Sequence, residues 1–269
     1  PVFGPDGSEI AVVRGESVIA FAPDGAAPRT IAPGTGADWA TVPTSSELLP
    51  DLDQRPPANV AVAYVGGRYR IGFASAVDNV GRGPLWIRGL RNGSSMRARQ
   101  LVRTSAGRIE SHLDAGTLRY TWSTTHSHWH YLAFERYELR RLSDNALVAR
   151  DRKTGFCLAD HYGHALRVRP GPPVFLGRCG TGKPQLRAVE QGSSRGYTDR
   201  YPAHYHGQNL DVTGVPEGVY LLVHRANPDA LLRERSYENN AASVRIRLSR
   251  TGGAPRVRVL RTCATSAHC

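Results

Sequence analysis

Several features that would point to common protein classes are scarce or missing in this chain of 269 residues. No apolar run approaches the roughly 20 residues that a helix needs to cross a bilayer, so we expect no membrane span. The chain has no initiating methionine and no signal-peptide pattern, so we expect a mature or trimmed product. Helical amphipathic patterns are hard to find, and short apolar runs bounded by Gly, Pro, Asn and Asp dominate. The sequence therefore predicts an all-β protein.

Cysteine is also scarce, with four residues and no Cys-x-x-Cys pair, which argues against a zinc ribbon. An even count in a loop-rich β fold favours disulfides and an oxidising compartment. Cys263 and Cys269 close a short loop near the end of the chain, and Cys157 and Cys179 bracket a loop rich in Gly and Pro. We therefore expect the disulfides Cys157–Cys179 and Cys263–Cys269 in a secreted, extracellular protein.

Lysine is rare beside arginine, and the net charge is +12. A strongly positive net charge is one feature of proteins that bind nucleic acids. The arginines are scattered through strand-like segments, as in Val244-Arg245-Ile246-Arg247, rather than clustered. Alternating arginines are typical of the solvent face of strands, so we expect no nucleic-acid partner. A charge of this sign also repels, rather than steers, a strongly cationic partner.

The composition changes along the chain. Residues 1–44 hold short strand-like runs separated by Pro-Asp-Gly turns, which resemble one repeat of a β-propeller and predict an N-terminal β-hairpin appendage with a linker. Residues 45–269 show the spacing and alternation of a β-sandwich with long irregular loops. The longest insertion runs from about Lys153 to Gly207, and one strand is expected over Tyr131–Leu139.

Three histidines at alternating positions are the most informative stretch. His126, His128 and His130 have aromatic flanks that favour a strand, on which all three would share one face. Imidazole suits copper, zinc, nickel or iron, and three nitrogens leave open the positions that a catalytic metal needs. The alternative is that these histidines bind no metal and are ordinary surface or core residues. The stretch predicts a transition-metal site without naming the metal.

Together with three later segments, these histidines resemble the lysyl oxidase family. The aromatic strand after His130 is similar to the family's copper motif, and Arg152-Lys153-Thr154-Gly155-Phe156-Cys157-Leu158-Ala159-Asp160 is similar to the segment with its cofactor lysine. Tyr201 stands where the family has its cofactor tyrosine, and Glu234-Arg235-Ser236-Tyr237-Glu238-Asn239-Asn240 is similar to the segment near the end of the catalytic domain. Order and spacing agree over roughly residues 48–250.

The resemblance implies a copper-dependent amine oxidase with a lysine tyrosylquinone cofactor formed from Lys153 and Tyr201. Such an enzyme converts a primary amine (a small amine, lysine or a lysyl peptide), dioxygen and water to an aldehyde, hydrogen peroxide and ammonia. Asp199, two residues before Tyr201, is the candidate general base, with Asp160 and His206 as alternatives.

A calcium site is implied as well, because hard oxygen ligands suit this ion. Its candidate ligands are Asp51, Leu52, Glu234, Asn239 and Asn240. The chain departs from the animal family members in having few cysteines, so it resembles a bacterial secreted homologue. Two other hypotheses stay open: a non-enzymatic secreted metal-binding or matrix-interaction module of the same fold, and a non-haem iron or zinc enzyme that uses the same histidines.

Overall fold

The protein is described from a computed structural model. The residues that the structure describes are 2–3, 10–14, 17–21, 28–33, 46–123, 127–151, 155–160, 163, 165, 167–203 and 208–269. The residues His126, Arg152, Lys153, Thr154, His206 and Gly207, named above, lie outside this set. The described residues form strands and turns and no helix, which confirms the all-β prediction. Accordingly, none of them belongs to a helix that could cross a membrane.

The chain divides into two compact units, Pro1–Ser46 and Glu47–Cys269. The first unit is a four-stranded antiparallel sheet in the order β1-β2-β3-β4. Its strands are β1 (Val2–Phe3), β2 (Ile10–Arg14), β3 (Ser17–Phe21) and β4 (Arg29–Pro33).

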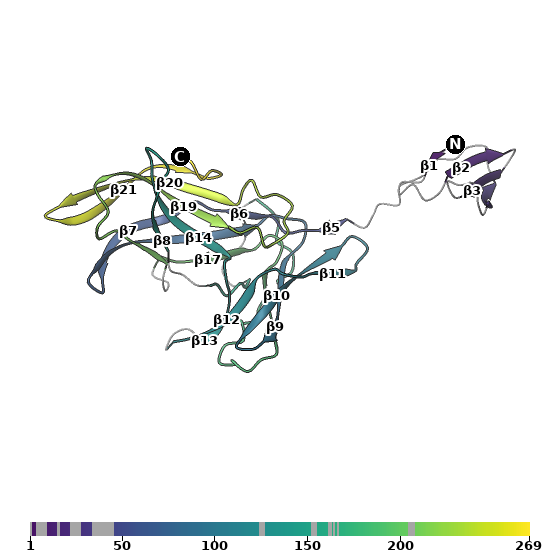
Figure 1. The fold of residues 1–269 in the computed structure, drawn as a ribbon, viewed down its shortest axis with the longest axis horizontal. Helices are drawn as coiled ribbons and strands as arrows, with labels where there is room; N and C mark the ends of the chain where they lie inside the picture. Colours follow the sequence, from purple (N-terminus) through teal and green to yellow (C-terminus); the bar gives the residue numbers. More distant parts are fainter. Residues whose placement is uncertain are drawn as a thin grey trace. The chain divides into compact units, whose positions relative to one another are not determined.

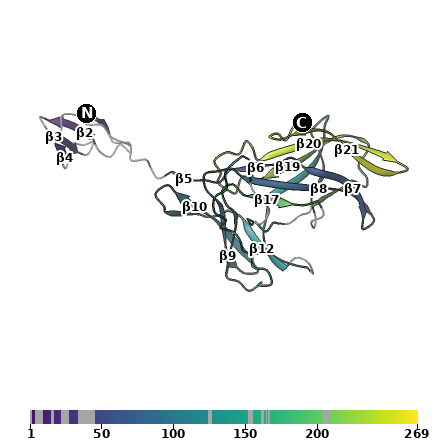
Figure 2. The ribbon, with the colours of Figure 1, turned by 180° about the vertical axis from the view of Figure 1, so that it is seen from behind.

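The second unit contains three sheets (Figure 1), seen from behind in Figure 2. The first is centred on β8 (Arg68–Asn79), which pairs with β6 (Leu52–Gln54), β7 (Ala58–Val65), β17 (Thr198–Tyr201) and β18 (Asn209–Asp211). The second has the order β15-β14-β19-β20-β21. Its strands are β14 (Glu135–Arg141), β15 (Leu147–Arg150), β19 (Gly218–Ala226), β20 (Ala241–Thr251) and β21 (Ala254–Cys263).

The third sheet, called the histidine sheet here, has seven strands and the main order β13-β12-β10-β9-β16. These strands are β9 (Leu85–Asn92), β10 (Ser95–Thr104), β12 (Thr117–Trp122), β13 (Ser127–Tyr131) and β16 (Ala188–Ser193). Two short strands, β5 (Glu47–Leu48) and β11 (Ile109–His112), pair with β10. Strand β10 alternates buried Met96 and Ala98 with exposed Arg97 and Arg99, which is why it lies with one face on the core.

The first two sheets pack face to face through aromatic rings. The ring of Phe73 on β8 lies 4.9 Å from that of Tyr137 on β14 and 4.6 Å from that of His224 on β19. All three side chains are fully buried. The long apolar runs of β8 and β19 are therefore explained by burial between two layers.

The expected strand over Tyr131–Leu139 is wrong, because the chain changes sheets there. Tyr131 pairs with Leu118 in the histidine sheet, whereas Glu135 pairs with Ala226 in the β19 sheet. The turn between them holds Ala133 at φ 59°, a left-handed conformation outside the β region. This turn brings the histidine strand against the sandwich.

The insertion from about Lys153 to Gly207 is also more ordered than expected. It supplies β16 to the histidine sheet and β17 to the β8 sheet. Short sequences such as Thr198–Tyr201 carry little periodicity of their own, and pairing with longer strands makes them β. The segment therefore connects the two sheets that carry the candidate site.

Candidate metal centre and cofactor site

Strand β13 holds two of the three predicted histidines on one face. His128 pairs with Thr121 of β12 and His130 pairs with Arg119, so the four side chains share a side of the sheet. The Nε2 atoms of His128 and His130 lie 2.8 Å apart. The structure thus brings these two imidazoles together as the alternation predicted.

This geometry fits a metal ion held through Nε2. Two nitrogens that bind one ion at about 2.0–2.1 Å lie roughly 3 Å from each other. The other ring nitrogen of His130, Nδ1, lies 3.1 Å from the hydroxyl oxygen of Thr121. A histidine that binds through Nε2 carries its proton on Nδ1 and can donate it to this oxygen, which fixes the ring orientation. Thr121 was not anticipated, although strand pairing opposite the histidines is the signal that could have found it.

Trp129 anchors the same strand from its other face. Its side chain is fully buried, its backbone N–H donates to Cys179 O (2.9 Å), and its Nε1 donates to Lys183 O (3.2 Å). The Cys157–Cys179 disulfide is present, as predicted, and holds the segment that receives these bonds. The histidine strand is therefore fixed by packing on one side, while the side that carries His128 and His130 stays half-buried.

Tyr201 lies on β17, and 5 % of its surface is exposed. Its hydroxyl oxygen lies 2.9 Å from Asp199 Oδ2 and 3.1 Å from the carbonyl oxygen of Cys157, and both are acceptors. Asp199, two residues earlier on the same face, is also buried. The phenol is thus oriented by a carboxylate and a backbone carbonyl in a largely dry environment.

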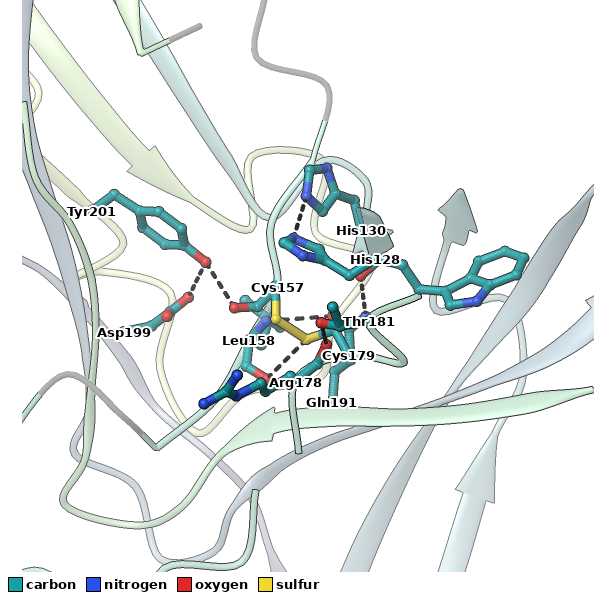
Figure 3. The surroundings of a disulfide bond; sticks show 11 residues. His128, His130, Cys157, Leu158, Arg178, Cys179, Thr181, Gln191, Asp199 and Tyr201 are labelled. Atoms are coloured by element: carbon teal, nitrogen blue, oxygen red, sulfur yellow. Dashed lines mark hydrogen bonds between the residues drawn. A yellow bond between two sulfur atoms is a disulfide. The ribbon is translucent and has the colours of Figure 1, made fainter. Parts of the chain in front are cut away.

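The segment Gly155–Cys157 links Tyr201 to the histidine strand, and Figure 3 shows Cys157 beside Tyr201. A Cβ atom at Gly155 would lie 2.6 Å from His130 Cβ, so only glycine allows this approach. Phe156 exchanges two backbone hydrogen bonds with Tyr131, and its ring lies 4.9 Å from the Tyr201 ring. Three consecutive residues therefore contact the histidine strand and the tyrosine together.

Lys153 lies outside the described residues, two positions before Gly155 in the sequence. The whole chain contains only one other lysine, Lys183. The carbonyl of Lys183 accepts the bond from Trp129 Nε1, on the face of β13 opposite to His128 and His130. Of the two lysines, only Lys153 is close in sequence to the segment that contacts His130.

Asp160, an alternative candidate base, holds its loop together. Its carboxylate accepts hydrogen bonds from the backbone N–H groups of Val174, Phe175 and Ser194 and from the Ser194 hydroxyl. Three of these bonds go to Oδ2 and one to Oδ1, so both oxygens of the carboxylate are engaged. This arrangement favours Asp199 over Asp160 as the carboxylate beside Tyr201, and His206 lies outside the described residues.

The five predicted calcium ligands also come together. Glu234 accepts hydrogen bonds from the backbone N–H of Leu52 (2.9 Å) and from the side chain of Asn240 (2.8 Å), and Asn239 donates to Asp51 (2.7 Å). The side-chain oxygens of Asn239 and Asn240 are buried and have no hydrogen-bond partner among the residues that the structure describes. These two amide oxygens, together with the carboxylates of Asp51 and Glu234, are ligands that suit a hard cation. Leu52 could contribute only its backbone carbonyl oxygen.

Burial raises the pKa of the Glu234 carboxyl to about 7, against the opposing effect of hydrogen bonds from Asn227, Asn240 and Leu52. The nearby Asp51 carboxylate raises this pKa further. A cation in this cluster would favour the charged form of both carboxylates. The oxygen atoms of the cluster and the raised pKa of Glu234 therefore fit a site that a bound cation would stabilise.

A buried polar network lies behind Tyr201 and was not anticipated. Ser75 pairs with Tyr201 across β8 and β17, and its hydroxyl lies 2.7 Å from Glu135 Oε1 and 3.0 Å from His224 Nδ1. Tyr137 donates to the same Glu135 carboxylate. Burial lowers the pKa of His224 well below its usual range, so this imidazole is neutral at physiological pH. Residues from four distant segments meet here, which no local pattern reveals.

Comparison with known families agrees with the four sequence segments. The family model described as "Lysyl oxidase" matches residues 92–257 of this chain, which is more than half of it. The chain belongs to the lysyl oxidase family. The matched range contains the histidine strand, the Gly155–Cys157 segment and Tyr201.

Individual lysyl oxidase relatives are distant. Lysyl oxidase homolog 2 of Gallus gallus is 30% identical over 133 residues, covering 49% of this chain and 16% of the relative. Lysyl oxidase homolog 2A of Danio rerio is 29% identical over 156 residues, covering 55% and 19%. Lysyl oxidase homolog 2 of Rattus norvegicus is 25% identical over 223 residues, covering 81% and 27%. The chain thus matches about a quarter or less of the length of these relatives.

Proposed function

We propose that the protein is a copper-dependent amine oxidase that acts on primary amines (small amines, lysine or lysyl peptides). The products would be an aldehyde, hydrogen peroxide and ammonia, with dioxygen as the oxidant and water as the source of the aldehyde oxygen. One observation carries this proposal: the three residues Gly155–Cys157 contact both the histidine strand, at His130 and Tyr131, and the buried Tyr201. Family membership supports the amine-oxidase class.

Each residue of the site has a role in the proposal. His126, His128 and His130 would hold copper, and Thr121 would orient His130. Lys153 and Tyr201 would be linked as the lysine tyrosylquinone. Copper and this quinone, when present, would supply the electron acceptor for amine oxidation. Asp199 would take the proton from the carbon next to the amine nitrogen, because a buried carboxylate 2.9 Å from the Tyr201 oxygen is within reach of groups bound there.

The choice of Lys153 rests on the scarcity of lysine. Only Lys153 and Lys183 exist in the chain, and Lys183 lies in the segment that packs on the opposite face of β13. An amine must lose its proton to act as a nucleophile, which a desolvated lysine does more readily than a solvated one. Lys183 is exposed, which makes it a poor candidate for this role.

Two further properties belong to the proposal. The cluster of Asp51, Leu52, Glu234, Asn239 and Asn240 would bind calcium, supported by the two orphaned amide oxygens. The protein would work in an oxidising, extracellular compartment, since both of its cysteine pairs are disulfide-bonded.

The test uses the two lysines as a matched pair. After copper loading in air, the wild type should develop quinone absorbance and amine-dependent peroxide release, and its mass should reveal a cross-link between the peptides that contain Lys153 and Tyr201. Lys153→Ala and Tyr201→Phe should abolish all three signals while copper stays bound, and Lys183→Ala should keep them. His128→Ala should lose copper. Retained quinone in Lys153→Ala would refute the cofactor assignment, and copper binding without quinone in the wild type would favour the non-enzymatic module.

A further inference from the structure

A row of exposed arginines continues the face of the histidine sheet that carries His128 and His130. Arg119 on β12 lies directly opposite His130, and Ser95 on β10 lies opposite Arg119. Arg97 and Arg99 follow Ser95 on the same face of β10, and Arg88 on β9 lies opposite Arg99. Arg88, Arg97, Arg99 and Arg119, called the arginine row here, are all exposed.

The arginine row begins beside the candidate metal centre and leads away from it (Figure 1 shows the order of β13, β12, β10 and β9). Side chains directly opposite each other on neighbouring strands lie about 5 Å apart at Cβ. Successive side chains on one face of a strand lie about 7 Å apart. Arg119 is therefore roughly 5 Å from His130, and Arg99 is roughly 17 Å from it.

Three members of the arginine row lack the acidic partners that several other arginines of the described chain have. Arg68, Arg140 and Arg233 each form an ion pair with a carboxylate at 2.8 Å or less. For Arg97, Arg99 and Arg119, no ion pair to a described residue occurs.

Few carboxylates lie near the arginine row. Arg88 has only a loose contact of 3.8 Å with Glu190. Asp114 lines a hollow of about 310 Å³ with Arg97 and Arg99 without pairing with either. Like charges opposite each other, as in Arg88 and Arg99, are unfavourable in a sheet unless an anion joins them.

We propose that the arginine row is a docking surface for an acidic polypeptide, which presents a lysine to the adjacent centre. The inference rests on the proposed amine oxidation and adds the substrate's charge. An extended chain advances about 3.3–3.6 Å per residue, so acidic side chains about two to five residues from the lysine would reach Arg119, Arg97 and Arg99.

Electrostatics gives the reason that such a substrate is needed. A lysine side chain has a pKa near 10.4 and approaches as a cation, which the arginine row and the net charge of +12 repel. Carboxylates that flank the lysine reverse the sign of this interaction. Because the arginines are exposed, the attraction is screened beyond about 10 Å at 0.1 M salt, so docking should weaken as salt rises.

Binding without turnover is the first experiment. The probe is a fluorescent peptide rich in Asp and Glu that contains no lysine. The wild type should bind it with an affinity that falls with added NaCl, and Arg97→Glu/Arg99→Glu should weaken binding about tenfold. The matched control is Arg256→Glu/Arg258→Glu on β21, which reverses two exposed arginines two positions apart and lowers the net charge equally. Equal weakening in both variants, or none in the first, would overturn the docking surface.

A second experiment measures turnover and distinguishes failure of this inference from failure of the proposed function. Peroxide release is compared for a short alkylamine, a peptide with a lysine between acidic residues, and its counterpart with Asn and Gln. The wild type should prefer the acidic peptide, Arg97→Glu/Arg99→Glu should lose that preference through KM, and kcat for the alkylamine should stay unchanged. If no amine is oxidised by the wild type, the proposed function fails while the binding result still decides the docking surface.

Discussion

Asp199 Oδ2 accepts a hydrogen bond from the hydroxyl of Tyr201 at 2.9 Å, and both side chains are buried on one face of β17. The first prediction follows from this pair. Asp199→Asn keeps the size and an acceptor oxygen but cannot take up a proton, so kcat for amine oxidation should fall about 100-fold or more. Copper content and quinone absorbance should stay at wild-type levels. Turnover within a few-fold of wild type at full quinone content would exclude Asp199 as the base.

The second prediction concerns Thr121 and the orientation of His130. Thr121→Val removes the hydroxyl that lies 3.1 Å from His130 Nδ1 and keeps the shape of the side chain. Loss of such an outer partner lowers metal affinity about 10- to 100-fold, which competition with a chelator would measure. Thr117→Val on the same face of β12 is the control and should leave copper affinity unchanged. Equal affinities in the two variants would contradict the role of Thr121.

The third prediction compares the two disulfides. Cys157–Cys179 closes a span of 22 residues and Cys263–Cys269 a span of 6. Chain entropy predicts a stability loss of about 3 kcal/mol for replacing the first pair by alanine and about 2 kcal/mol for the second, measured by denaturant unfolding. Only the first replacement should also lower quinone formation, because Cys157 O accepts from the Tyr201 hydroxyl. Quinone yields that fall equally in both variants would argue against this link.

The fourth prediction tests the calcium cluster. Calcium at a hundredfold excess over its Kd should stabilise the wild type by about 2.7 kcal/mol, seen as a rise in Tm over a sample in EDTA. Asp51→Asn removes a charge but keeps an oxygen that can accept from Asn239, and it should reduce the calcium-dependent rise. Asp114→Asn, at an exposed acid without an ion pair to a described residue, should keep it. Identical Tm values with calcium and with EDTA would show that the cluster does not bind calcium.

The fifth prediction follows from the buried His224. Its pKa lies well below 6.5 in the folded protein, so below about pH 6.5 the unfolded chain binds a proton that the folded protein does not. This residue should therefore lower the unfolding free energy by about 1.4 kcal/mol for each pH unit below about 6.5. Above about pH 6.5 it should have no effect on the unfolding free energy.

His224→Gln can keep a bond to Ser75 and should lose this slope, whereas His268→Gln at an exposed position should retain it. Urea unfolding between pH 8 and pH 5 measures the difference between the two variants and the wild type. A slope in His224→Gln equal to that of the wild type would show that another group carries the pH dependence.

The sequence by itself determined the all-β class, the cysteine pairing and the local chemistry of each segment. These follow from short-range physics: alternation sets which side chains share a face of β13, and a spacing of two puts Asp199 beside Tyr201. The resemblance to the lysyl oxidase family came from the same local segments, and the family match agrees with it.

The tertiary structure alone decided which segments meet. The turn at Ala133 sends β13 and β14 into different sheets, and the segment 155–157 then lies between His130 and Tyr201. Thr121 and the arginine row become visible only through strand register, because residues far apart in sequence are neighbours only once strands pair. Pairing across sheets depends on the packing of the whole core, and no window of the sequence contains that information.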